Sequence, residues 1–144
     1  MERYVYYQPN KKDIKDRQGD CAVRALTRFF GLSWLEAFDE LVVYARETQE
    51  MVNSLTNIKR LLSDKNIGYH AHYAERQTVE EFAKERKTGF YLLYIKAGFR
   101  THMVTVVDGK YYDTWDCGKK LVYGYWRNPS PGEYTFVSSK NRGC

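Results

Sequence analysis

Residues 102–115 read HMVTVVDGKYYDTW, and this stretch predicts a β-hairpin. Two runs rich in apolar, β-branched and aromatic residues flank Asp108-Gly109, a dipeptide that two-residue hairpin turns favour. Such a turn pairs residue 107 with 110, 104 with 113 and 102 with 115. His102 and Asp113 then share one face of the hairpin as diagonal neighbours, within reach of a hydrogen bond.

The sequence on either side of this hairpin predicts strands after residue 89 and helices before it. Alternating patterns predict strands at 90–95 and 121–126, with edge strands at 4–7 and 134–137. Apolar residues at helical spacing, with capping residues beside them, predict four helices. These run from Asp20 to Gly31, from Ser33, from about 54 to 65, and from Thr78 to before Gly89. The predicted fold class is α+β, with a helical N-terminal half and an antiparallel sheet in the C-terminal half.

The composition favours one folded domain spanning residues 1–144. Hydrophobic residues make up 43% and charged residues 28%, which excludes a disordered chain and a collagen-like fibre. No run approaches the roughly 18 apolar residues of a membrane span, and the first four residues lack the apolar stretch of a signal peptide. We therefore expect a cytoplasmic protein that does not contact a membrane.

The cysteines and the charge distribution exclude several further classes. Cys21, Cys117 and Cys144 lie far apart, so neither a disulfide framework nor a thiolate metal cage is predicted. The net charge is +5, and both ends of the chain are basic while the middle is slightly acidic. An acidic or nucleic-acid partner would suit these ends. However, a charge of this size is common in domains that bind neither, and we do not expect nucleic-acid binding.

Cys21 falls in the first turn of a predicted helix, for which Asp20 is the expected N-cap. At that position the helix dipole and the unpaired backbone N–H groups favour a thiolate. His102 would favour it further, and Asp113 would hold the imidazole in one orientation. Together the three residue types form a candidate Cys-His-Asp nucleophilic site.

At these residues the sequence resembles the papain-like cysteine peptidase superfamily. Members have, in this order, a cysteine at a helix N-terminus, a histidine that opens a strand, and an Asn or Asp on a following strand. QGDC at 18–21 is similar to the sequence at the family's nucleophile, HMVTVV at 102–107 to its histidine strand, and DTW at 113–115 to its Asn-Ser-Trp. YGYWR at 123–127 resembles the next strand. The short chain is most similar to compact members, such as Josephin-type deubiquitinases and bacteriocin-processing peptidase domains.

The resemblance implies a papain-like cysteine hydrolase, or thiol protease, that acts on a protein or peptide without cofactor or metal. Cys21 would be the nucleophile and His102 the general base and then the general acid. Asp113, rather than Asp116, would orient the histidine. Trp115 would shield the hydrogen bond between His102 and its carboxylate.

The resemblance also implies an oxyanion hole, built from the backbone N–H of Cys21 and the side chain of Gln18. Gln18 lies three residues before the cysteine, whereas papain has its glutamine six residues before, where this chain has Lys15. Gln8 is therefore an alternative donor.

Two other functions fit the same residues. The triad also supports an acyltransferase or a transglutaminase-type enzyme. A catalytically inactive papain-like binding module would instead use its basic ends to hold a protein or a nucleic acid. The sequence gives neither the substrate, nor the cleavage specificity, nor the oligomeric state, nor the source.

Two further features have competing interpretations. Arg24, one helical turn after Cys21, is a candidate thiolate neighbour or substrate anchor, but we favour a structural or solvent-facing ion pair. His70 and His72 would share one face of a strand and, with Cys117, could bind zinc. We favour an exposed edge strand at 69–73 instead.

Overall fold

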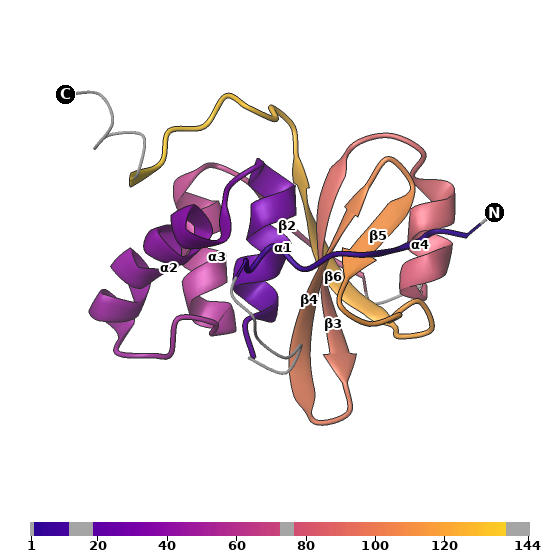
Figure 1. Ribbon diagram of the computed structural model, residues 1–144, viewed down its shortest axis with the longest axis horizontal. Helices are drawn as coiled ribbons and strands as arrows, with labels where there is room; N and C mark the ends of the chain where they lie inside the picture. The colour runs from indigo at the N-terminus through magenta and orange to yellow at the C-terminus, as the bar shows by residue number, and fades with distance from the viewer. Residues whose placement is uncertain (1, 12–18, 73–76, 138–144) are drawn as a thin grey trace.

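A mixed six-stranded sheet is the centre of the computed structural model, which describes residues 2–11, 19–72 and 77–137 (Figure 1). Four helices accompany it in these residues, so the predicted α+β class is confirmed. The elements are β1 (Tyr4–Tyr6), α1 (Cys21–Phe30), α2 (Trp34–Thr48), α3 (Leu55–Asp64), β2 (Tyr69–Ala71), α4 (Val79–Glu85), β3 (Phe90–Ala97), β4 (Arg100–Val107), β5 (Lys110–Asp113) and β6 (Val122–Asn128). No helix among the described residues is long and apolar enough to cross a membrane.

The strand order is β1-β5-β4-β3-β6-β2, and the predicted hairpin forms its β4–β5 pair. Val107 pairs with Lys110, and Asp108 and Gly109 both have positive φ angles, of 48° and 83°, as a two-residue turn requires. Every neighbouring pair is antiparallel except β1 and β5, which are parallel. The predicted purely antiparallel sheet is therefore wrong at this edge, because no hairpin fixes the direction of a strand that begins some hundred residues from its partner.

The sheet separates two hydrophobic clusters (Figure 1). Helix α1 packs against β4, α2 packs on α1 and α3 on α2, while α4 lies at the other side beside β5. Successive side chains of β3 point to opposite faces of the sheet, so β3 contributes to both clusters. Leu92 joins the cluster with α1–α3, and Leu93 joins the cluster with α4. Helix α1 is thereby fixed against the strand that carries His102.

Of the four helix-capping residues that the sequence predicts, three cap their helices as expected. Ser33 and Thr78 form the predicted capping boxes of α2 and α4. Gly31 ends α1 with a φ of 73°. Asp20 occupies the N-cap position of α1, but its side chain makes no capping hydrogen bond, so this part of the prediction is wrong.

The edge segments give one confirmation and one correction. Strand β2 pairs with β6 alone and has only exposed residues, as favoured for this segment, although residue 73 lies outside the described residues. The predicted strand at 134–137 does not form. The aromatic residues of this segment pack against α1 instead, since Tyr134 and Phe136 both contact the ring of Phe30 edge-on.

Candidate active site

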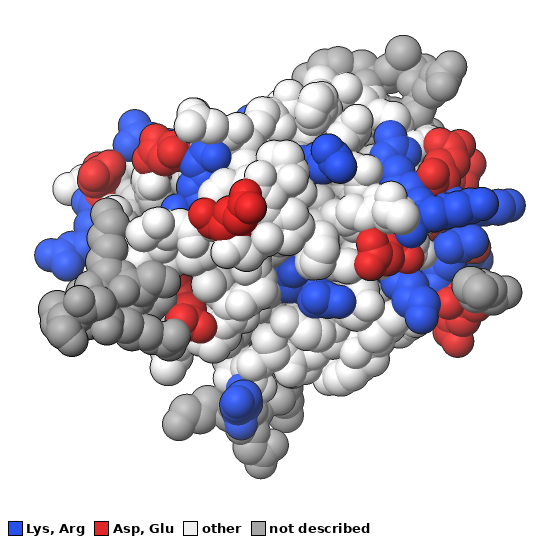
Figure 2. Space-filling model, turned by 90° about the horizontal axis from the view of Figure 1, so that it is seen from above, with Lys and Arg blue, Asp and Glu red and all other residues white. Residues whose placement is uncertain are grey.

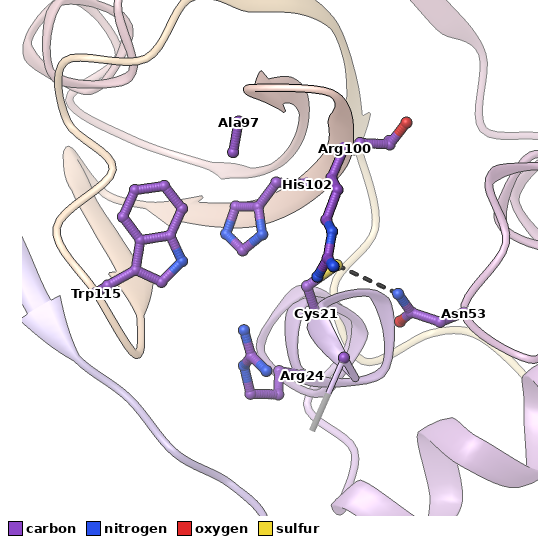
Figure 3. Close-up of a pocket in the computed structure, with 9 residues that line it drawn as sticks. Cys21, Arg24, Asn53, Ala97, Arg100, His102 and Trp115 are labelled. Atoms are coloured by element: carbon purple, nitrogen blue, oxygen red, sulfur yellow. Dashed lines mark hydrogen bonds between the residues drawn. The ribbon is translucent and has the colours of Figure 1, made fainter. Parts of the chain in front are cut away.

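The N-terminus of α1 meets β4 and β5 at a cleft of about 590 Å³ (Figure 3). Cys21 is the first residue of α1, His102 lies near the start of β4, and Asp113 ends β5. All three side chains are buried. The residues that line the cleft are Gly19, Cys21, Arg24, Asn53, Ala97, Arg100, Thr101, His102 and Trp115.

The contact between His102 and Asp113 is the one that the hairpin register predicts. Nε2 of His102 donates a hydrogen bond to Oδ2 of Asp113 over 2.5 Å, and Asp113 is only 3% exposed. This bond occupies one ring nitrogen, so Nδ1 is the nitrogen left for the thiol of Cys21. Trp115 lies beside this pair, with its ring centroid 5.0 Å from that of His102 (Figure 3). Trp115 thus forms part of the cleft wall next to the imidazole.

The electrostatics of Cys21 and His102 favour a charged pair. Burial alone raises the pKa of the Cys21 thiol, but the hydrogen bond and charge of His102, with smaller contributions from Asn53 and the Met103 backbone, lower it overall. Burial alone lowers the pKa of His102, but its hydrogen bonds to Asp113 and Cys21 raise it to about 9. These shifts favour the thiolate form of Cys21 and the imidazolium form of His102.

Arg24 fixes the carboxylate of Asp113 from α1. Its Nη2 donates to Oδ1 of Asp113 over 3.3 Å, and its Nη1 donates to Asp20. Asp20 also accepts a hydrogen bond of 2.9 Å from the indole of Trp34. Since the side chains of Arg24, Asp20 and Asp113 are 7%, 8% and 2% exposed, this is a buried ion-pair network. The favoured interpretation of Arg24 as a structural ion pair is confirmed, although the residue does not face solvent.

Asn53 is the site residue that the sequence analysis missed. It comes from the loop between α2 and α3, immediately before the N-cap of α3. Its Nδ2 donates to Sγ of Cys21 over 3.3 Å, and its Oδ1 accepts from the backbone N–H of Ala22 over 2.7 Å (Figure 3). Asn53 thus caps α1 in the place expected for Asp20. No spacing motif links a loop asparagine to a cysteine 32 residues earlier.

The other candidate residues have different positions. Gln18 lies outside the described residues, and Gln8 is not among the described residues that line the cleft. Asp116 accepts hydrogen bonds from the hydroxyl of Tyr111 and the backbone N–H of Gly118, so Asp113 is the carboxylate at His102.

Three buried residues next to the cleft are of types that can bind a metal, but their contacts favour hydrogen bonding among themselves. His102, Asp113 and Cys117 have nitrogen, oxygen and sulfur atoms within 4.8 Å of one another. Two of these groups are already bonded to each other, and burial together with Asp113 raises the pKa of the Cys117 thiol, which keeps it protonated. The zinc alternative at His70 and His72 gains no support, because neither joins a three-ligand group among the described residues. His70 instead stacks on Tyr125, with 5.0 Å between ring centroids.

On the face in Figure 2, Lys and Arg side chains of the described residues lie beside Asp and Glu side chains. The described residues of this face therefore present mixed charge, whereas binding to a phosphate backbone favours a surface of basic side chains.

Comparisons with protein-family models, with curated proteins and with solved structures give no match for this chain.

Proposed function

We propose that this protein is a papain-like cysteine hydrolase that cleaves an amide, isopeptide or thioester bond in a protein or peptide. The observation that carries the proposal is the chain of contacts from Asp113 through His102 to Cys21 at an open cleft. A carboxylate that holds an imidazole against a helix-terminal thiol is the arrangement that activates cysteine nucleophiles. The order of the three residues and their element types support the papain-like assignment.

The reaction proceeds in two steps, acylation of Cys21 and hydrolysis of the acyl-enzyme. The Cys21 thiolate attacks the carbonyl carbon and a C–S bond forms. The bond from that carbon to the leaving amine or thiol then breaks, and the leaving group takes the proton from the imidazolium of His102. A water molecule then attacks the acyl-enzyme and gives one proton to the now neutral imidazole. The C–S bond breaks, the acid product leaves, and the thiolate–imidazolium pair is restored.

Asp113 orients the imidazole in both steps. Its contacts with Arg24 and with the backbone N–H of Thr114, at 2.7 Å, hold the carboxylate in place while His102 changes its protonation state. The cleft is large enough for part of a peptide, and Arg100 adds an exposed cation to its wall.

The proposal is tested with p-nitrophenyl acetate, an activated ester that acylates nucleophilic thiols. We expect a burst of about one p-nitrophenolate per chain, followed by slower turnover as water releases the acetyl group. Mass spectrometry of the quenched protein at neutral pH should find the acetyl group on Cys21 at more than ten times its level on Cys117. Cys117 is the internal control, because it is buried and its thiol has a raised pKa.

Acetylation that is equal at the two cysteines, or no burst, would contradict the proposal. Capture of the acetyl group by an added amine in preference to water would instead indicate an acyltransferase on the same triad. A protein that is not acetylated and that binds a partner through its basic ends would support the inactive binding module.

The protonation of His102 gives a second prediction. We expect NMR titration of its imidazole to give a pKa near 9, about 2.5 above the ordinary value of roughly 6.5. The Cys21→Ala variant should lower this pKa, because it removes the hydrogen bond and charge of the thiolate. The stability linked to this proton is present below about pH 6.5 and is lost as the pH rises through 9. The His102→Ala spectrum assigns the signal, and a value at or below 6.5 would be inconsistent with an imidazolium held by Asp113.

A further inference from the structure

The side-chain amide of Asn53 has an unambiguous orientation. A backbone N–H can only donate, so the atom that faces Ala22 N at 2.7 Å must be Oδ1. The opposite end of the amide, Nδ2, is therefore the atom that lies 3.3 Å from Sγ of Cys21. The contact with Ala22 thus fixes a hydrogen-bond donor beside the nucleophile, without any assumption about an amide flip.

Asn53 is also placed to act on a substrate. It carries the only side-chain amide among the described residues that line the cleft. The guanidinium of Arg24, by contrast, is held by Asp20 and Asp113. In Figure 3, Asn53 approaches Cys21 from the side opposite Trp115, so the sulfur lies between the amide and the indole.

We propose that Nδ2 of Asn53 is the side-chain donor of the oxyanion hole, with the backbone N–H of Cys21 as its partner. This inference rests on the proposed function. When Sγ attacks, the carbonyl oxygen becomes an anion separated from the sulfur by a single carbon atom. A donor 3.3 Å from Sγ is positioned to reach that oxygen at the required distance of about 2.7–3.1 Å.

The amide performs two roles in sequence. Before attack it donates to the thiolate and helps to lower the pKa of Cys21. As the C–S bond forms, the negative charge moves from sulfur to oxygen, and the same N–H group then donates to that oxygen. Because Oδ1 stays bonded to Ala22, the amide needs little reorganisation during the reaction, which is the property that makes an oxyanion hole effective.

The test compares two reactions of Cys21 in the Asn53→Ala and Asn53→Asp variants. Alkylation by iodoacetamide is a displacement at a saturated carbon and forms no oxyanion, whereas acylation by p-nitrophenyl acetate passes through one. Both rates are taken at the pH-independent plateau, so that a changed thiol pKa does not affect them. We expect acylation to fall about 100- to 1,000-fold and alkylation to change less than about threefold.

The two variants separate catalysis from folding. Asn53→Asp keeps an oxygen that can accept from Ala22 but has no N–H group, so it should fold like the wild type and still lose acylation. Asn53→Ala loses both contacts, and circular dichroism verifies that it is folded. Thr56→Ala removes a polar side chain that is exposed on α3 and does not line the cleft, and it should leave both rates within about twofold.

Three results would overturn the inference. Equal losses in acylation and alkylation would mean that Asn53 only positions Cys21. A loss of acylation in Gln18→Ala but not in the Asn53 variants would assign the donor to Gln18. Failure of the wild type itself to be acylated would instead overturn the proposed function, and the role of Asn53 with it.

Discussion

At pH 6, the His102→Ala variant should be alkylated by iodoacetamide at Cys21 about a hundred times more slowly than the wild type. Burial raises the pKa of this thiol, and the hydrogen bond and charge of His102 are the largest effects that oppose it. Without the imidazolium, the pKa should return to at least the ordinary value of about 8.5, which leaves less than roughly 1% thiolate at pH 6. The measurement is the alkylation rate of each cysteine across pH 4–9, read by mass spectrometry.

The difference between the two proteins should shrink as the pH approaches 9, since the variant then gains thiolate. Cys117 should react slowly in both proteins, because its buried thiol has a raised pKa for reasons that do not involve His102. His70→Ala is the matched control: this histidine is exposed on β2 and does not line the cleft. If Cys21 has the same pH profile with and without His102, the thiolate–imidazolium pair does not exist and Cys21 is a packed core residue.

The contact between His102 and Asp113 was predictable because it depends on local chemistry. The Asp108-Gly109 turn sets the register of the hairpin, and the register then sets which side chains meet several residues away. The start of α1 at Cys21 was predictable for a similar reason. Gly31 and the spacing of apolar residues delimit the helix without reference to the rest of the chain.

The surroundings of these residues were not predictable, because they depend on contacts between distant segments. Asp20 is of a residue type that commonly caps helices, but its carboxylate instead accepts hydrogen bonds from Arg24 and Trp34. The helix end is then capped by Asn53, which only the packing of the α2–α3 loop brings close. The interaction of Arg24 with Asp113 likewise requires α1 to pack against the hairpin.

The Arg24→Ala variant should be destabilised by about 3–5 kcal/mol in urea unfolding at neutral pH. This arginine is the shared cation of two buried carboxylates, Asp20 and Asp113, whose side chains are at most 8% exposed. Its removal leaves Asp20 without a cation and leaves Asp113 with His102 alone, in a poorly solvated environment where an unpaired charge costs far more than it would at the surface. For a domain of this size, we expect the melting temperature to fall by about 10 °C or more.

Arg60→Ala is the matched control for this prediction, since Arg60 also forms an ion pair from a helix but with Glu47 at 3.6 Å and with both side chains more than half exposed. Its loss should cost less than about 1 kcal/mol, because water solvates the remaining carboxylate. Arg24→Lys should fall between the two, because an ammonium keeps the charge but lacks the two-armed fork that spans Asp20 and Asp113. If Arg24→Ala is no less stable than Arg60→Ala, water reaches the two carboxylates, and the burial that supports the orientation of His102 is absent.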